Sequence, residues 1–451
     1  MTIATVIMAA GQGTRMKSQM PKMIHTLNGR PLITYAVSLA EQVGDIPPVV
    51  VIGHSAETVR KAVQVDARFA IQQEQLGTGH AVLQAAALLK ERAEYVLVWA
   101  ADMPLLTAAS LELLLETQKQ NDGPFSLLTL FTEKPRGFGR IVRDTSGALQ
   151  AIVEEAQATP EELAIRELNP GFYCFDAEWL WRVLPDLPLS SKGEYYLTDL
   201  VALAVERGEN ISTSEIADAV EAIGINTRAH LAEAEALLRE RINRSWMERG
   251  VTMIDPTTTY IGSDVTIGLD TIVLPNTHIT GSSTIGAACT IGPNSIVRDT
   301  EIGDRCKVES SVLEQAVLED EVDIGPFGHL RRGAHLAAGV HMGNFGEVKN
   351  SYLGPGVKLG HFSYVGDANI GARTNIGAGT ITCNFTMDGQ KHKTSIGTDT
   401  FIGSDSMLVA PLNIGSRSGT GAGSVVTKDV PDDALAVGVP ARVIRRFAKD
   451  G

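Results

Sequence analysis

A glycine-rich loop near the start of the chain carries the first residues that could do chemistry. Its sequence is Ala9-Ala-Gly-Gln-Gly-Thr-Arg15, and Pro21-Lys22 follows it. A Gly-x-Gly pair alone is more often a tight turn than a phosphate site. Here it follows an apolar stretch, so backbone N–H groups at the end of a strand could point at a phosphate. Arg15 and Lys22 add the positive charge that a triphosphate requires.

One side chain further along could hold a divalent cation. Asp102 comes two residues after the end of the apolar stretch Tyr95–Ala100. Carboxylate oxygens suit Mg²⁺. A lone Asp is often a helix N-cap or a turn residue. The place of Asp102 at the end of an apolar stretch, together with the glycine-rich loop upstream, favours a metal ligand that acts on phosphates.

The C-terminal half contains two cations and a histidine that could work together. Arg331 and Lys349 are separated by three six-residue units, and His361 follows in Gly360-His-Phe-Ser-Tyr364. Two cations on neighbouring turns of a repeat repel each other unless an anion such as a phosphate lies between them. Two solvated side chains on an outer face would explain the same spacing. His361 is the candidate general base, although most surface histidines are not catalytic.

The elements that must position the N-terminal residues alternate in type along residues 1 to about 228. Short apolar runs predict buried strands at Ile3–Ala10, Pro48–Gly53 and Tyr95–Ala100. Amphipathic stretches predict helices at Gly79–Arg92 and Ala108–Gln118. This alternation predicts a mostly parallel sheet with helices on both faces. Ligands on such a sheet bind beyond the carboxyl ends of the strands.

The C-terminal half has a six-residue period that neither an α-helix nor an alternating strand requires. It predicts a parallel β-helix in which three hexads form one coil and residues one coil apart stack about 4.8 Å from each other. In such a coil His329, His335 and His341 point to three different sides, so no metal cluster is expected among them. The repeated aliphatic positions are Ile261, Ile267, Val273, Ile279, Ile285, Ile291, Val297, then Ile324, Leu330, Leu336, Met342, Val348, and finally Ile396, Ile402, Leu408, Ile414.

Two irregular segments interrupt this plan. Residues 229–250 are rich in strong helix formers and end at Gly250, which predicts a helical linker. The repeat also breaks between Thr382 and Ile396, which predicts a loop extruded from the coil and shaping a binding face. The expected domains are therefore residues 1–228, a linker at 229–250 and a β-helix at 251–451.

Composition excludes several classes of protein. The net charge of −14 argues against non-specific nucleic-acid binding. No apolar run approaches the ~20 residues of a membrane span, and the first residues lack the cationic start of a signal peptide. The four cysteines are scattered without a Cys-x-x-Cys pair, which favours reduced thiols in a cytoplasmic protein.

The N-terminal motifs resemble those of sugar-1-phosphate nucleotidyltransferases, with a Rossmann-like α/β fold. The glycine-rich loop with Arg15 and Lys22, the segment from Gln72 to Gly79 and the Asp102 segment carry the resemblance. It implies that Asp102 and Asn226 hold Mg²⁺. The residues it implies for binding UTP and the product are Met8, Ala9, Ala10, Gly11, Arg15, Lys22, Gln72, Gly77, Thr78, Ala100, Ala101, Asp102, Gly139, Glu154, Asn169 and Asn226.

Nearly the whole chain resembles the bacterial bifunctional N-acetylglucosamine-1-phosphate uridylyltransferase / glucosamine-1-phosphate acetyltransferase family. The segments Gly250–Pro256 and Asn375–Asn384 extend the likeness into the hexad region. In that family the repeats form a left-handed β-helix. The resemblance implies that His361 accepts a proton, that Arg331 and Lys349 bind the sugar phosphate, and that Tyr364 and Asn375 contact the sugar. The residues it implies for acetyl-CoA are Ala378, Asn384, Phe385, Ser404, Ala422 and Arg442.

The resemblance implies a homotrimeric cytoplasmic enzyme that makes UDP-N-acetylglucosamine for peptidoglycan and lipopolysaccharide from glucosamine 1-phosphate, acetyl-CoA and UTP. Phe385 stands where the family has a tyrosine, the loop after it is longer, and the tail Val437–Arg442 is closer to generic hexapeptide acyltransferases. These departures concern contacts with CoA. The alternative is a monofunctional sugar-1-phosphate nucleotidyltransferase with a structural β-helix.

Overall fold

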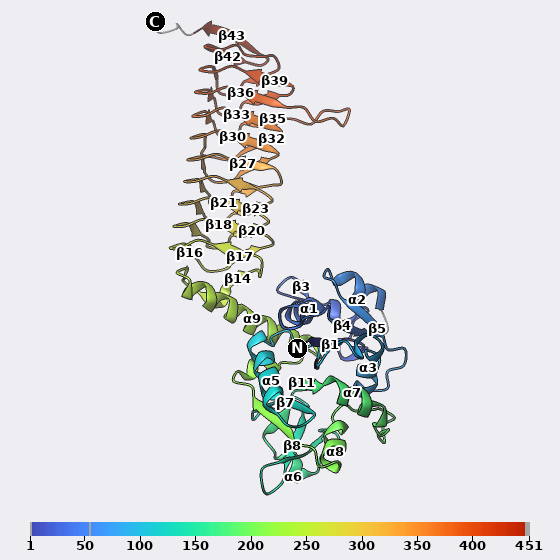
Figure 1. Cartoon of the computed structure of the whole chain (residues 1–451). Coiled ribbons are helices and arrows are strands. Elements are labelled where there is room, and N and C mark those ends of the chain that lie inside the picture. The colour runs from blue at the N-terminus through green and yellow to red at the C-terminus, as the bar shows by residue number, and fades with distance from the viewer. Residues whose placement is uncertain (1, 54–55, 447–451) are drawn as a thin grey trace. The chain divides into compact units, whose positions relative to one another are not determined.

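The computed structural model describes residues 2–53 and 56–446 and divides into two compact units, residues 1–238 and 239–451 (Figure 1). Helix α9 (Arg228–Glu248) is the helix that the sequence predicts at 229–250, and the division between the units falls inside it. The three-part division at residues 228 and 250 stays a prediction. No helix in the described part of the chain combines the length and the apolar character that a membrane span requires.

The first unit is built on one sheet whose four strands on one side run parallel. The predicted strands at Ile3–Ala10, Pro48–Gly53 and Tyr95–Ala100 are confirmed, each with slightly different ends. Their parallel register places their carboxyl ends at the same edge of the sheet. In sheet order these strands are β5 (Arg68–Ile71), β4 (Val49–Ile52), β1 (Ile3–Met8) and β6 (Tyr95–Ala100).

The other side of this sheet corrects the expectation of a mostly parallel sheet, because most neighbouring strands there pair antiparallel. β8 and β9 are joined by residues 144–148 alone, and a connection that short allows only a hairpin. The strands continue in sheet order as β11 (Tyr173–Asp176), β7 (Phe125–Phe131), β10 (Glu167–Asn169), β8 (Gly139–Arg143) and β9 (Leu149–Val153), and β12 (Ile211–Glu215) pairs parallel with β7.

Helices cover both faces of this sheet, as predicted. One buried cluster contains Val82, Leu180 and Leu200, and a second contains Ile33 and Leu111. The helix predicted at 79–92 is instead two short helices, because bonds from residue i to i−3 tighten the chain at the junction. The described helices are α1 (Leu32–Val43), α2 (Ala56–Ala62), α3 (Thr78–Leu83), α4 (Ala86–Leu89), α5 (Ala108–Gln120), α6 (Pro160–Leu163), α7 (Ala177–Val183) and α8 (Asp199–Glu206).

In the second unit the described residues form the predicted parallel β-helix with three sheets, here called the first, second and third face. The first face contains β13 (Thr252–Met253), β16 (Ile272–Val273), β19 (Thr290–Ile291), β22 (Lys307–Val308), β25 (Asp323–Ile324), β28 (His341–Met342), β31 (Lys358–Leu359), β34 (Asn375–Ile376), β37 (Phe401–Ile402), β40 (Gly419–Thr420), β42 (Ala434–Gly438) and the antiparallel β43 (Ala441–Arg446).

The second face contains β14 (Thr259–Ile261), β17 (Thr277–Thr280), β20 (Ile296–Arg298), β23 (Val312–Glu314), β26 (His329–Leu330), β29 (Gly346–Lys349), β32 (Ser363–Gly366), β35 (Ile381–Cys383), β38 (Met407–Val409) and β41 (Val425–Val426). The third contains β15 (Thr266–Ile267), β18 (Thr284–Ile285), β21 (Glu301–Ile302), β24 (Val317–Leu318), β27 (Ala334–Leu336), β30 (Ser351–Leu353), β33 (Ala368–Ile370), β36 (Thr394–Ile396) and β39 (Leu412–Ile414). The first corner lies between the first and second faces, and the second corner between the second and third.

The register of the coils is less regular than the six-residue period predicts. Val273 pairs with Ile291, which lies three hexads further along the chain. The next two steps on this face, from Ile291 to Val308 and from Val308 to Ile324, are both shorter than three hexads. The aliphatic residue of each strand still points into one continuous core.

The three histidines of the hexad region diverge as predicted. His329, His335 and His341 lie on the second, third and first face respectively, so the prediction that they point to different sides is confirmed.

The extruded loop is also confirmed. Ile370 pairs with Ile396, a step much longer than three hexads, so residues 385–393 leave the coil as a hairpin, here called the arm, between β35 and β36 (Figure 1). An antiparallel bridge between Phe385 and Lys391 closes its base.

Candidate functional site

The predicted nucleotide-binding segments of the first unit lie together at the carboxyl ends of its parallel strands. Beyond β1, the N–H of Ala9 donates to Val51 O at 2.8 Å. Beyond β6, the N–H of Ala101 donates to Met8 O at 3.0 Å. Ala9, Ala10 and Ala101 are buried and offer backbone groups, and Met8 and Ala100 are the last residues of their strands. One edge of the sheet therefore carries both the glycine-rich loop and the Asp102 segment, as the rule for parallel sheets predicts.

Three predicted residues from distant parts of the chain converge at this edge. Lys22 Nζ donates to Asp102 Oδ2 at 2.5 Å and to Asn226 Oδ1 at 2.8 Å. The N–H of Ile225 donates to Asp102 O at 2.9 Å, which holds the Asn226 segment beside the Asp102 loop. The Lys22 side chain is only 8% exposed. The two predicted metal ligands are thus adjacent, and a cationic group already lies against both of their oxygens.

The donor set at this point fits Mg²⁺. Asp102 Oδ1 is buried and has no hydrogen-bond partner in the described part of the chain. Asn226 Oδ1 offers a second oxygen, and the same Lys22 ammonium donates to it and to Asp102. The described residues contain no cluster of three or more His, Cys, Asp or Glu that could hold a metal by themselves. Mg²⁺ commonly takes one or two protein oxygens and completes its shell with phosphates and water, so two ligands suffice.

The segment from Gln72 to Thr78, which the sequence predicts to bind UTP, is held in shape by side chains and one glycine. Gln72 is buried, and its Nε2 donates to Gly77 O at 3.0 Å. Gly77 has φ +96°, and a Cβ there would lie 2.5 Å from Tyr195 O, so only glycine fits. Thr78 Oγ1 accepts from the N–H of Leu197 at 3.0 Å. Gly11 has open space where a Cβ would stand, and Arg15 is exposed in the turn after the loop.

Three further residues that the sequence predicts to bind UTP and the product lie on or directly after the antiparallel strands. Gly139 begins β8 and Glu154 follows β9. Glu154 accepts from Thr198 Oγ1 at 3.0 Å, and burial raises the pKa of its carboxyl. Asn169 uses both amide atoms within the fold, donating to the hydroxyl of Tyr173 at 2.6 Å and accepting from the N–H of Gly171 at 3.1 Å. Its polar atoms therefore fix the turn after β10.

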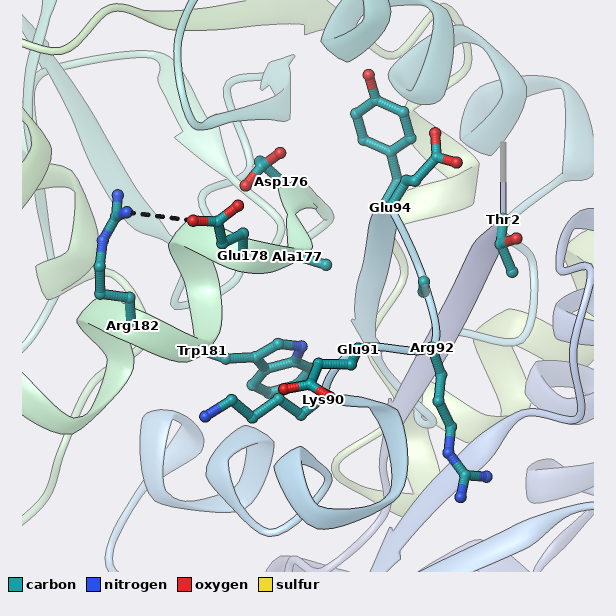
Figure 2. Close-up of a pocket in the computed structure, with 12 residues that line it drawn as sticks. Thr2, Lys90, Glu91, Arg92, Glu94, Asp176, Ala177, Glu178, Trp181 and Arg182 are labelled. Atoms are coloured by element: carbon teal, nitrogen blue, oxygen red, sulfur yellow. Dashed lines mark ion pairs between the residues drawn. The ribbon is translucent and has the colours of Figure 1, made fainter.

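A cleft of about 890 Å³ in the first unit lies away from these residues (Figure 2). Trp181 and Lys90 line it together with Tyr95, which begins β6, whereas Asp102 follows the other end of that strand. Arg182 and Glu178, which also line it, form an ion pair of 3.7 Å. Figure 2 marks this pair with a dashed line. No residue that the sequence predicts for the site is among those that line this cleft. The chemistry at the carboxyl edge therefore does not use it.

In the second unit the predicted pairing of Arg331 with Lys349 holds. Leu330 pairs with Val348, and the N–H of Arg331 donates to Val348 O at 2.9 Å, which places the two cations on adjacent coils. The sequence did not predict that Arg331 also donates to Glu347 Oε1 at 2.9 Å. That hydrogen bond raises the pKa of Arg331. Glu347 could have been identified as the partner of Arg331 only from the stacking register, which cannot be read from residue types.

Tyr364 lies on the next coil of the second face, in β32, and His361 lies at the first corner that leads into that strand. His361 is exposed at the first corner and forms no hydrogen bond or ion pair with described residues. Tyr364 pairs in register with Glu347, so its ring lies beside the residue that binds Arg331. Asn375 instead belongs to the first face, where it pairs with Phe401. One chain therefore does not bring Asn375 and Tyr364 onto the same face.

The residues predicted for acetyl-CoA form separate groups. Ala378, Ser404 and Ala422 lie at the first corner of successive coils, because the N–H of Asp405 donates to Ala378 O and the N–H of Gly423 donates to Ser404 O. Asn384 lies buried at the second corner, and Phe385, on the arm, is 66% exposed. Arg442 is exposed in β43. Within one chain the second face separates the first corner from the second.

Comparison with known proteins accounts for both units. The family described as MobA-like NTP transferase domain matches residues 5–253, and the hexapeptide repeat of succinyl-transferase matches residues 283–312 and 393–428. A protein of Heliobacterium modesticaldum named bifunctional protein GlmU is 46% identical over 96% of this chain and 94% of its own length. Proteins of the same name from Geotalea uraniireducens and Halalkalibacterium halodurans are 44% and 42% identical over 96% of this chain, covering 96% and 95% of their own lengths.

A solved structure of CMP:2-keto-3-deoxy-manno-octonic acid synthetase complexed with CTP is 19% identical, covering 53% of this chain and 100% of that one, with a TM-score of 0.41. A likeness at that score is too weak to establish a fold.

Proposed function

This chain belongs to the family of bifunctional GlmU proteins, and we propose a role for each of its two units. It is a bifunctional enzyme that makes UDP-N-acetylglucosamine. The solenoid acetylates glucosamine 1-phosphate with acetyl-CoA, and the first unit transfers UMP from UTP to N-acetylglucosamine 1-phosphate and releases pyrophosphate. The observation that carries the uridylyl transfer assigned to the first unit is the convergence of Asp102 and Asn226 on Lys22.

In the first unit the residues act mainly by placing charge. We expect Arg15 and Lys22 to hold the phosphates of UTP, with the backbone of the glycine-rich loop donating to them. Asp102 and Asn226 would hold Mg²⁺, which when bound neutralises phosphate charge during an in-line transfer. The Lys22 ammonium must turn from Asp102 toward a phosphate when a metal takes its place. Gln72 and the loop through Thr78 fit the role of reading the base.

In the second unit the chemistry requires a proton acceptor beside a held sugar phosphate. Arg331 and Lys349 on adjacent coils offer two cations to one phosphate. His361, on the next coil, accepts the proton of the sugar amine as that amine attacks the thioester. General base catalysis of this kind contributes about 10²–10⁴-fold. The Ser404 hydroxyl or a backbone N–H would stabilise the oxyanion.

We propose that the solenoid is a homotrimer. Phe327, Phe345 and Phe362 lie at the first corner of successive coils, and each is more than half exposed. The rings of Phe327 and Phe345 lie 5.2 Å apart and nearly parallel. An exposed aromatic column of this kind is typical of a surface that another protein covers. Because Tyr364 and Asn375 lie on different faces of one chain, a neighbouring copy is also needed to bring both to one sugar.

The substrates, UTP and acetyl-CoA, indicate a cytoplasmic enzyme. The test is to incubate the protein with glucosamine 1-phosphate, acetyl-CoA, UTP and Mg²⁺, and to follow CoA thiol and pyrophosphate separately. Release of both in sequence is expected. Pyrophosphate release only when N-acetylglucosamine 1-phosphate is supplied, without any CoA release, would overturn the acetyltransferase assignment and leave a nucleotidyltransferase with a structural solenoid.

A further inference from the structure

A buried carboxylate links three coils at the second corner, next to the predicted acetyltransferase residues. Asn350, Asp367 and Asn384 occupy the same corner position on successive coils, directly after β29, β32 and β35. Asp367 Oδ1 accepts from Asn350 Nδ2 at 2.5 Å, and its Oδ2 accepts from Asn384 Nδ2 at 2.5 Å. Asp367 and Asn384 are 8% and 6% exposed. These three side chains are called the corner ladder.

The ladder also holds both ends of the arm. The arm leaves the coil immediately after Asn384, whose carbonyl accepts from the N–H of His392 at 2.8 Å. It rejoins the coil at Thr394, whose N–H donates to Asp367 O at 3.2 Å. Asp367 therefore contacts the exit of the arm through its carboxylate and the return of the arm through its backbone.

The carboxylate is held in its ionised form. Burial alone raises the pKa of Asp367, but hydrogen bonds from Asn350 and Asn384, helped by the charges of Lys391 and Lys349, bring its pKa below the ordinary value. Only an ionised carboxylate offers an acceptor to each of two amides without a proton between them. The charge thus determines which atom of each amide faces Asp367.

The ladder lies against the second face through Gly366. A Cβ on Gly366 would lie 2.3 Å from the Tyr364 hydroxyl and 2.9 Å from Asn384 Nδ2. The absence of a side chain at that position lets the Tyr364 phenol and the Asn384 amide approach the same backbone atom. The ladder thus connects a residue proposed for the sugar with one proposed for acetyl-CoA.

We propose that Asp367 is a positioning residue of the acetyltransferase. By accepting from Asn384 Nδ2 it presents the oxygen of the Asn384 side-chain amide to the ligand, and it fixes the arm that carries Phe385. The proposal rests on the acetyltransferase function proposed above. It assigns to Asp367 an effect on the KM for acetyl-CoA rather than a part in proton transfer.

The test uses two variants of the full-length enzyme. Asp367→Asn keeps the shape and suits the left-handed backbone, φ +52°, at this corner. The two neighbours donate to different oxygens of Asp367, and the substitution replaces one of these oxygens by an NH₂ donor. One neighbour then loses its acceptor, and the Asn384 amide loses its single orientation. We expect the KM for acetyl-CoA to rise about 10-fold with kcat changed less than threefold.

The second variant combines Asn350→Asp with Asp367→Asn and restores the order of the ladder. The amide then at position 367 donates to the carboxylate at position 350, and its oxygen accepts from Asn384. We expect this double variant to return within about threefold of the wild-type KM.

Tryptic cleavage at the exposed Lys391 and Lys393 of the arm provides a readout without activity. We expect faster cleavage in Asp367→Asn and wild-type cleavage in the double variant. Pyrophosphate formation should stay unchanged in both.

The outcomes separate the two proposals. A wild-type KM in Asp367→Asn, or a double variant that stays as impaired as the single one, would overturn the positioning role. If Asp367→Asn does not fold, the double variant alone decides, because loss of acetyl transfer in it also contradicts the proposal. A wild-type enzyme without acetyl transfer would instead refute the proposed function.

Discussion

Asp102→Asn should abolish most uridylyl transfer and leave acetyl transfer intact. The substitution keeps the shape of the side chain and removes the charge that faces Lys22, whose side chain is 8% exposed. Truncating one partner of a buried, hydrogen-bonded charge pair costs about 2–5 kcal/mol. Because 17% of the Asp102 side chain is exposed and Asn226 still accepts from Lys22, the lower half of that range applies, about 2–3 kcal/mol.

Two consequences follow for this variant. If the contact of the Asp102 carboxylate with Mg²⁺ contributes the same amount in the transition state, its loss slows pyrophosphate formation about 30–150-fold at 25 °C. If the same free energy is lost from folding, the melting temperature of the first unit falls by about 4–12 °C, since 1 kcal/mol corresponds to about 2–4 °C at this size. An assay at 25 °C therefore reports chemistry and not unfolding. Asp122→Asn, an exposed carboxylate of the same unit, is the matched control.

The assay follows pyrophosphate and CoA thiol in one preparation. We expect the first to fall and the second to stay within twofold of wild type. Equal loss of both activities in a folded protein, or an unchanged rate of pyrophosphate release, would show that Asp102 is not a ligand of the triphosphate site.

Three other outcomes are expected. His361→Ala should slow acetyl transfer about 10²–10⁴-fold while uridylylation of supplied N-acetylglucosamine 1-phosphate continues. The control is His341→Ala, at an exposed histidine on the first face, which should leave both rates unchanged. Acetyl transfer by His361→Ala within a few-fold of the wild-type rate would exclude His361 from catalysis. Because the pKa of Glu154 is raised, the native state binds more protons than the unfolded state just above pH 4.5, and the unfolding free energy should fall as the pH rises through that window. Urea titrations of Glu154→Gln should lack this dependence on pH. An identical dependence in the variant would contradict the assignment. Phe345→Ser should shift the protein from trimer to monomer in light scattering and lower acetyl transfer more than uridylyl transfer; a fully trimeric variant would exclude the aromatic column as the contact surface.

The solenoid was predictable from sequence because its determinant is local and repeated. One buried aliphatic residue per hexad is visible without knowing the fold, and it correctly separated His329, His335 and His341 onto three faces. The break in the aliphatic spacing between Val297 and Ile324 shows in the sequence that coils slip there, but it does not show which side chains then stack on each other. Glu347 and Asp367 were missed for the same reason, since their partners are defined only by the register.

The candidate site of the first unit shows a different limit. Asp102 could be placed from sequence because it ends a strong apolar strand, and ligands gather at that edge. Asn226 follows a 3-10 helix (Ala219–Ala222) and not a strand, so only the family resemblance could associate it with Asp102. The antiparallel half of the sheet was missed because β7, β8 and β9 follow one another without a helix between them, so this part of the chain departs from the alternation of strands and helices.

The arm shows that residues can be inserted at a corner of the β-helix without changing how the core residues of successive coils stack. Ile370 and Ile396 are neighbours in the stack and both buried, although the whole arm lies between them in the sequence. Lengthening a flexible loop costs only about 0.6 kcal/mol per doubling. A corner can therefore gain or lose residues over evolutionary time while the coils above and below keep their pairing. New segments can therefore be inserted at corners, and a designer could exchange whole arms between related enzymes without redesigning the core.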